Sequence, residues 1–134
     1  MIGLKDVQKL HSLRPDQGKL LEISKRTRTS GFYPFTLHPD SDVQIHSRLF
    51  CPALGIAEDP VTGTAGGPVG ANIVRFGLLP GAGETGLKVF SVCQGEAIGR
   101  AGILQVAACV KSGTVSEVSI AGRAVIAFKT EISL

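Results

Sequence analysis

The chain has 134 residues, of which 43% are hydrophobic and 19% charged, and its formal net charge is +3. This length suits one domain with its own core, and the hydrophobic content disfavours disorder. No stretch approaches the roughly 20 consecutive apolar residues of a membrane span, and the N-terminus lacks a charged-then-apolar signal pattern. We therefore expect one folded domain over residues 1–134, in the cytoplasm and not in a membrane.

Much of the positive charge lies early in the chain, at Lys19, Lys25, Arg26 and Arg28. Nucleic-acid sites usually combine such charge with aromatic side chains on which bases stack, and none accompanies it here. A solvated helix end is therefore the favoured interpretation, and we expect no nucleic-acid partner.

Metal and disulfide chemistry is not indicated by the cysteines and histidines. The three cysteines are Cys51, Cys93 and Cys109, and the three histidines are His11, His38 and His46. The cysteines are odd in number and lack C-x-x-C spacing, which favours buried free thiols. The histidines are scattered without the spacing of metal ligands, so we expect no metal site.

Two short helices are expected at the N-terminus. Asp6 can cap a helix that extends through Leu13, and Asp16 can cap a second that extends through Ser24. An aspartate at this position accepts from the free N–H groups of the first turn. Gly31 ends the helical region.

Two strand-like runs follow, at 32–37 and 44–50, and the segment 38–42 between them is rich in turn residues. In the second run, polar and apolar residues alternate, which is typical of a strand with one buried face. Arg48 then lies on the face away from the core.

A central helix is expected at about 64–79, because apolar residues recur there at helical spacing. Its early glycines are poor helix formers, and taking Gly67 as the cap would put Pro68 at the first helical position. The small residues, and the lack of charge between Thr64 and Val74, favour a helix buried on all sides by a surrounding sheet over a surface helix.

The C-terminal part is strand-rich. Strands are expected at 87–92, 103–110, 117–120 and 124–128, with a tight turn at 121–123. The segment 81–86 matches G-x-G-x-x-G but leads into a strand, so we interpret it as a loop and not as a dinucleotide site. With the helices, this pattern predicts the α+β class.

The stretch from Glu58 to Ala65 carries the chemistry. Asp59 precedes a proline, which favours an extended backbone and turns its carboxylate away from its own main chain. Thr62, Gly63 and Thr64 then open the central helix, whose free N–H groups can bind a carboxylate or phosphate. An acid and an anion cradle therefore lie side by side.

The same region resembles a known family. The residues that carry the likeness are Arg48, Phe50, Pro52, Gly55, Glu58, Asp59, Pro60, Thr62 and Gly63. They are similar to the segment R-x-F-x-P-x-x-G-x-x-E-D-P-x-T-G-S-A of the PhzF-like phenazine-biosynthesis proteins. The segment 94–100 resembles that family's Q-G-x-x-M-G-R, and the likeness extends from about Leu10 to the C-terminus.

The resemblance implies one half of a diaminopimelate epimerase-like fold, in which a curved mixed or antiparallel sheet wraps a central helix. It also implies a cofactor-independent isomerase or epimerase that moves a proton on a small carboxylated metabolite. Asp59 would be the catalytic acid, and Thr62, Gly63 and Thr64 would bind the substrate. Arg48 and Glu58 would support the site. Thr64 stands where the family usually has serine, and the hydroxyl is kept.

Family members are about twice as long, and their catalytic glutamate and a histidine lie in an N-terminal half. This chain resembles the C-terminal half only, and neither Glu58 nor Glu96 has a pattern that marks it as a replacement. Three hypotheses follow: an isomerase domain completed by a separate N-terminal-half chain, a self-associating binding or structural homodimer, or a truncated remnant.

Simpler structural roles are also open for the motif residues. Asp59 could only cap a turn by accepting from the N–H of Val61 or Thr62. Arg48 could pair with an acidic neighbour and hold the loop. For Gln94 and Arg100 we favour a role in stabilising a turn.

Overall fold

The computed structural model describes residues 1–132, within which there are eight strands, three α-helices and two short 3-10 helices. The strands are β1 (Ile2–Gly3), β2 (Pro34–Leu37), β3 (Ile45–Ser47), β4 (Leu49–Cys51), β5 (Ile56–Asp59), β6 (Gly86–Gln94), β7 (Gly102–Lys111) and β8 (Thr114–Gly122). The helices are α1 (Val7–Ser12), α2 (Gln17–Thr27), α3 (Gly63–Phe76), η1 (Pro52–Leu54) and η2 (Glu96–Ile98).

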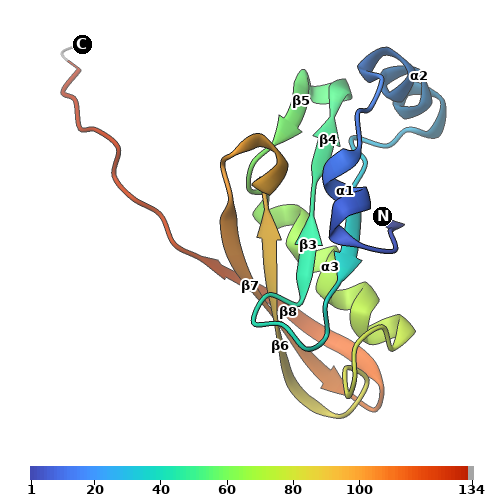
Figure 1. The fold of residues 1–134 in the computed structure, drawn as a ribbon. Coiled ribbons are helices and arrows are strands. Elements are labelled where there is room, and N and C mark those ends of the chain that lie inside the picture. The colour runs from blue at the N-terminus through green and yellow to red at the C-terminus, as the bar shows by residue number, and fades with distance from the viewer. Residues whose placement is uncertain (133–134) are drawn as a thin grey trace.

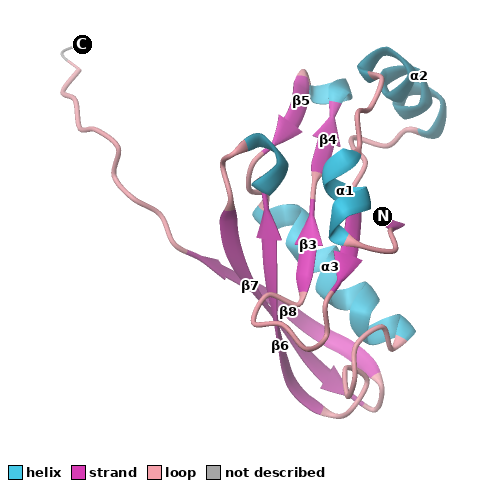
Figure 2. Ribbon diagram, viewed as in Figure 1, coloured by secondary structure: helices cyan, strands magenta, loops and turns pink. Residues whose placement is uncertain are grey.

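Six strands form one mixed sheet in the order β1-β2-β3-β6-β7-β8 (Figures 1 and 2). The pairs β1–β2 and β3–β6 are parallel, and the other neighbours are antiparallel. The strands β4 and β5 form a separate two-stranded sheet. The predicted α+β class and mixed sheet are confirmed.

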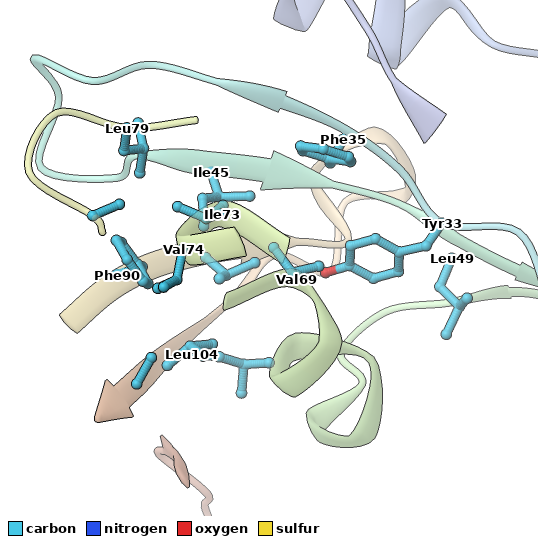
Figure 3. Packing of buried hydrophobic residues seen from close by; sticks show 14 of the residues in the cluster. Tyr33, Phe35, Ile45, Leu49, Val69, Ile73, Val74, Leu79, Phe90 and Leu104 are labelled. Carbon is cyan, nitrogen blue, oxygen red and sulfur yellow. The ribbon is translucent and has the colours of Figure 1, made fainter. Parts of the chain in front are cut away.

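The core is built around α3. Side chains from β2, β3, β6 and β7 pack against one side of the helix, as Figure 3 shows for Phe35, Ile45, Phe90 and Leu104. The side of α3 that faces them carries Gly66, Val69, Gly70, Ile73 and Val74. A central helix against a curved sheet is therefore the arrangement that the sequence predicted.

Close approach between α3 and the sheet depends on glycine. A Cβ at Gly70 would lie 2.5 Å from Cγ1 of Val106 on β7, which is too close for any side chain. The expectation that α3 is buried on all sides is wrong, however. Pro68 and Arg75 are exposed, and Phe76 is 61% exposed. The sheet reaches around one side of the helix only.

The bounds of α3 differ from those expected. Thr62 is the N-cap, so the helix begins before Gly67 and includes Pro68, and Gly77 ends it in the left-handed conformation with φ 58°. Pro68 is the sixth residue of the helix, where it forgoes the one bond that an N–H would donate to the main-chain oxygen of Thr64. Tertiary packing against β7 overrides the weak helix propensity of the glycines.

Both predicted helix caps are present at the N-terminus. The Asp6 carboxylate accepts from the backbone N–H of Lys9 at 2.7 Å, and the Asp16 carboxylate accepts from that of Lys19 at 3.0 Å. The basic residues of α2 are exposed, as expected for a solvated helix end.

The single strand expected at 44–50 is divided at Arg48. The first part, β3, pairs in the large sheet, whereas β4 pairs with β5, a strand that the sequence analysis did not predict. Arg48 was expected on the face away from the core but is only 5% exposed. A strand-like run of residues cannot reveal that its two ends pair in different sheets.

The C-terminal strand predicted at 124–128 is absent from the described chain, and 121–123 is not a tight turn, because β8 continues through Gly122. Gly122 pairs with Leu104, close to where β7 begins, so the chain beyond it has no neighbouring strand among residues 1–132. This tail leaves the sheet and extends away from it (Figure 1). Val125, Ile126 and Phe128 are 92%, 76% and 79% exposed.

Candidate functional site

A cavity of about 450 Å³ opens beside the N-terminus of α3. Its polar side includes Asp59, Thr62 and Thr64, three of the residues expected to form the site. The rest of its wall is mainly apolar and is formed by Met1, Ser30, Gly31, Tyr33, Leu49, Cys51, Leu54, Ile56, Ala65 and Pro68. A carboxylate at the edge of a mostly apolar cavity is typical of a small-molecule site.

Asp59 is the last residue of β5, where it pairs with Leu49, and Pro60 follows it. Its Oδ2 atom accepts a hydrogen bond from the Thr62 hydroxyl. The half-buried carboxylate is therefore held by a side chain, and no hydrogen bond to it from the N–H of Val61 or Thr62 occurs within residues 1–132. The turn-capping alternative is not the geometry observed.

Gln94, at the end of β6, contacts Asp59 and Thr62 but does not line the cavity. Its side chain is fully buried, and its Nε2 donates to the main-chain oxygen of Asp59 at 2.7 Å and to Oγ1 of Thr62 at 3.0 Å. From the sequence, a role in stabilising a turn was expected for Gln94. Its place in a recognisable motif was the available signal, but its contact with Asp59 exists only because the end of β6 lies beside the Asp59-Pro60 corner.

The first turn of α3 presents backbone N–H groups near the cavity. The first helical bond of this turn runs from the N–H of Gly66 to the oxygen of Thr62 at 3.3 Å, and the Thr62 side chain makes no cap bond. The N–H groups of Gly63, Thr64 and Ala65 precede that bond and suit an anionic oxygen. Thr64 is exposed, and a Cβ at Gly63 would meet nothing within 4 Å.

Arg48 and Glu58 form a bidentate ion pair next to the cavity. Arg48 donates from Nε to Oε1 at 2.9 Å and from Nη2 to Oε2 at 2.6 Å. Its Nη1 donates to the main-chain oxygens of Leu10 and Leu13, each at 3.0 Å, and so closes the end of α1. Neither residue contributes to the cavity wall. The pairing of Arg48 with an acidic neighbour is therefore observed, whereas the support that both residues would give to the site stays a prediction.

Cys51 lies in the cavity wall and is buried. Burial raises the pKa of its thiol, and the negative charge of Asp59 raises it further. The thiol therefore stays protonated at neutral pH. All three cysteines are free; Cys93 is also buried, whereas Cys109 is half-buried.

A second polar cluster forms on the other face of the sheet. Oε2 of Glu96 lies 2.7 Å from Nδ1 of His46 and 3.4 Å from Nε2 of His11. Burial by itself would raise the pKa of Glu96, but its interactions with His46 and His11 hold that pKa below its ordinary value. Burial and the Glu96 carboxylate raise the pKa of Cys93 to about 11. The histidines that are scattered in the sequence thus meet in the fold.

Two further observations concern residues 1–132. They contain no group of three or more His, Cys, Asp or Glu side chains placed to hold a metal ion. None of the helices in this part of the chain is long and apolar enough to cross a membrane.

Together, the mixed sheet curved around α3 and the Asp-Pro corner at the helix start define one half of a diaminopimelate epimerase-like fold. A crystal structure of a PhzF-family phenazine biosynthesis protein from Bacillus anthracis superposes with a TM-score of 0.73 at 27% identity, covering 90% of this chain and 40% of that one.

The family described as phenazine biosynthesis-like protein, PhzC-PhzF, matches residues 1–130, and the chain belongs to this family. An uncharacterized isomerase of Clostridium acetobutylicum is 44% identical over all of this chain and 44% of its own length. The uncharacterized isomerase YddE of Escherichia coli is 41% identical over 98% of this chain and 43% of its own. The chain thus spans less than half of the length of these relatives.

The trans-2,3-dihydro-3-hydroxyanthranilate isomerase of Pseudomonas chlororaphis is a more distant relative, 28% identical over 92% of this chain and 40% of its own length.

Proposed function

We propose that this chain supplies the Asp59 side of an isomerase site, which moves a proton on a small carboxylated molecule without a cofactor. The observation that carries the proposal is the Asp59 carboxylate beside the free N–H groups of α3 at the edge of one cavity. The isomerases among the relatives support the reaction type.

Each part of the cavity has a role in this reaction. The N–H groups of Gly63 and Thr64 and the Thr64 hydroxyl bind the substrate carboxylate, while the apolar wall accepts its carbon skeleton. Asp59 exchanges a proton with a carbon atom of the bound molecule. One proton leaves a C–H bond, another is added at a different position, and no electrons are gained or lost overall.

A second acid or base is needed to complete proton movement, and we propose that it comes from a segment equivalent to the other half of the relatives. The exposed apolar side chains Val125, Ile126 and Phe128 support association, because apolar surface of this kind is a liability in isolation. The same exposure favours the alternative of a self-associating, non-catalytic homodimer. A monomer at micromolar concentration in ultracentrifugation would remove this alternative.

The proposal is tested by mixing the 134-residue chain with a polypeptide that corresponds to the N-terminal half of the Clostridium relative. The first candidate substrate is trans-2,3-dihydro-3-hydroxyanthranilate, and the readout is product formation with deuterium uptake from D2O. Turnover should require both chains. Asp59→Asn should lower it by about 10²- to 10⁴-fold, whereas the exposed Glu22→Gln should leave it unchanged. Persistent inactivity with a folded partner and a panel of carboxylates would contradict the proposal.

The anion cradle has its own test. A side chain at Gly63 has room, so Gly63→Val should fold and yet cover the N–H groups beside it. Binding of small aromatic and amino-acid carboxylates, measured by calorimetry, should weaken by about tenfold or more, as for the loss of a charge-assisted hydrogen bond. Equal affinity for wild type and Gly63→Val would remove the cradle from the proposal.

A further inference from the structure

The geometry points to Gln94 as a positioning residue that orients the Asp59 carboxylate through the Thr62 hydroxyl. This inference rests on the proposed role of Asp59 as the proton-carrying group. Gln94 is fully buried and does not contribute to the cavity wall, so it acts on a bound molecule only through its neighbours.

The direction of each hydrogen bond follows from the chemistry of the groups. The main-chain oxygen of Asp59 can only accept, so the NH2 group of the Gln94 amide must face it. The same nitrogen therefore donates to Oγ1 of Thr62. The single proton of the Thr62 hydroxyl is then directed to Oδ2 of Asp59. The chain of donation runs from Gln94 to Thr62 to Asp59.

This order leaves the two oxygens of Asp59 in different states. Oδ2 accepts from Thr62, which disfavours a proton on that atom, and Oδ1 is left to exchange the substrate proton. The Gln94 amide also bonds both the main chain of Asp59 and the side chain of Thr62, the N-cap of α3. The end of β5 and the start of α3 are thereby fixed relative to each other, which is the precision that proton transfer requires.

Gly95 supplies an independent reason for the position of Gln94. Its φ is +87°, and a Cβ there would meet the main-chain oxygen of Arg100 across the turn and would lie 2.6 Å from the main-chain oxygen of Pro60. Only glycine lets the end of β6 approach the Asp59-Pro60 corner so closely. Gly95 therefore serves both the turn after β6 and the close contact with the Asp59-Pro60 corner.

The functional test compares four variants in the two-chain turnover assay. Gln94→Met keeps the volume but removes both donated bonds, Thr62→Val removes the hydroxyl, Thr62→Ser keeps it, and the fourth combines Gln94→Met with Thr62→Val. We expect Gln94→Met and Thr62→Val each to lower kcat by about 10- to 100-fold, the cost of a small misplacement, with KM nearly constant. Thr62→Ser should stay within about threefold of wild type.

The variant that combines Gln94→Met with Thr62→Val shows whether Gln94 acts on Asp59 through Thr62 or only stabilises the fold around it. If Gln94 acts through Thr62, the double variant should be no slower than the slower single variant, because the second change removes a link already broken. Multiplying losses would overturn the inference, as would a folded Gln94→Met with unchanged kcat. If Gln94→Met does not fold, Thr62→Val against Thr62→Ser decides whether the hydroxyl link operates.

A readout without turnover keeps the two proposals distinguishable. In NMR spectra of the 134-residue chain alone, the Thr62 hydroxyl proton should exchange slowly with water, and about tenfold faster in Gln94→Met for the loss of one hydrogen bond. Slow exchange in both proteins would overturn the positioning inference. The expected change in exchange, combined with no turnover, would contradict the isomerase proposal and leave the positioning of Asp59 in place.

Discussion

Glu58 and Asp59 are neighbours in sequence but lie in two different regions of the molecule. Both oxygens of Glu58 are bonded to Arg48, and its side chain is only 11% exposed. Asp59 has a hydrogen bond to Oδ2 from the Thr62 hydroxyl and lies at the edge of the cavity. The first region is a clamp of opposite charges in which both carboxylate oxygens are paired, whereas in the second the Oδ1 atom of Asp59 has no hydrogen bond within residues 1–132.

The difference shows how the fold gives two neighbouring carboxylates opposite surroundings over one peptide bond. Successive residues of a strand point to opposite sides, so β5 directs one acid inward and the other to the cavity. A buried carboxylate needs a cationic partner, and Arg48 provides it. The Asp59 corner can remain partly unpaired because the clamp beside it holds the strand in place.

The largest effect is expected from breaking the clamp. Arg48→Leu would leave the Glu58 carboxylate and the carbonyls at the end of α1 without their donors, so we expect a loss of about 3–5 kcal/mol in the free energy of unfolding. Urea denaturation followed by circular dichroism measures it. Arg100→Leu, at an exposed position, should change stability by less than about 0.5 kcal/mol. If Arg48→Leu and Arg100→Leu lost similar amounts of unfolding free energy, the Arg48–Glu58 pair would contribute no more to stability than an exposed arginine.

The Asp59 region depends on where α3 lies, which Gly70 determines. Gly70→Ala forces a methyl group against Val106 and should cost about 1–3 kcal/mol by overpacking. Gly67→Ala is the matched control, because its Cβ would lie at an ordinary 3.6 Å from Ile120. That variant should gain up to about 1 kcal/mol from helix propensity. Thermal denaturation of the two variants should therefore shift in opposite directions.

The comparison between Glu58 and Asp59 is tested most directly by replacing each carboxylate with the neutral amide. Glu58→Gln places an amide NH2 group where Arg48 donates, and we expect a loss of about 1.5–3 kcal/mol, as for hydrogen bonds to a charged group. Asp59→Asn keeps an acceptor for the Thr62 hydroxyl and should cost less than about 1 kcal/mol. Guanidinium unfolding at pH 7 measures the loss of unfolding free energy for each variant. A larger loss for Asp59→Asn than for Glu58→Gln would mean that Asp59, and not Glu58, is the acid that stabilises the fold.

The smallest effect concerns Glu96, a third carboxylate, which is held by histidines as Glu58 is held by arginine. Its pKa is lowered in the folded state, so its contribution to stability is complete above the ordinary glutamate pKa of about 4.3 and is lost as the pH falls through the lower, folded value. The stability difference between wild type and Glu96→Gln should therefore shrink as the pH is lowered from about 5 to about 3. A difference that is constant over this range would argue against the ion pairs with His46 and His11.

Local patterns predicted much of the fold and the site. Both N-terminal caps, the helix centred on Val69 and Ile73, and the strands that became β6 and β7 follow from spacing and capping chemistry. Asp59, Thr62 and Thr64 line one cavity whereas Gly63 does not, and their role in a functional site stays a prediction.

What failed involved partners far away in the sequence. A strand was expected at 124–128, but a strand needs a neighbouring strand with which to pair. The pairing of β8 with β7 stops at Gly122, which lies opposite Leu104 near the start of β7. The contact of Gln94 with Asp59 and the meeting of His11 with Glu96 also join distant segments.

The sequence by itself determined the helices and strands that hold the Asp59 corner, because helix caps, proline restrictions and apolar spacing act between near neighbours. Only the tertiary structure decided that Arg48 pairs with Glu58, that Gln94 supports Asp59 and that α3 is covered on one side. These outcomes depend on which strands lie next to each other, a long-range property that local residue patterns do not contain.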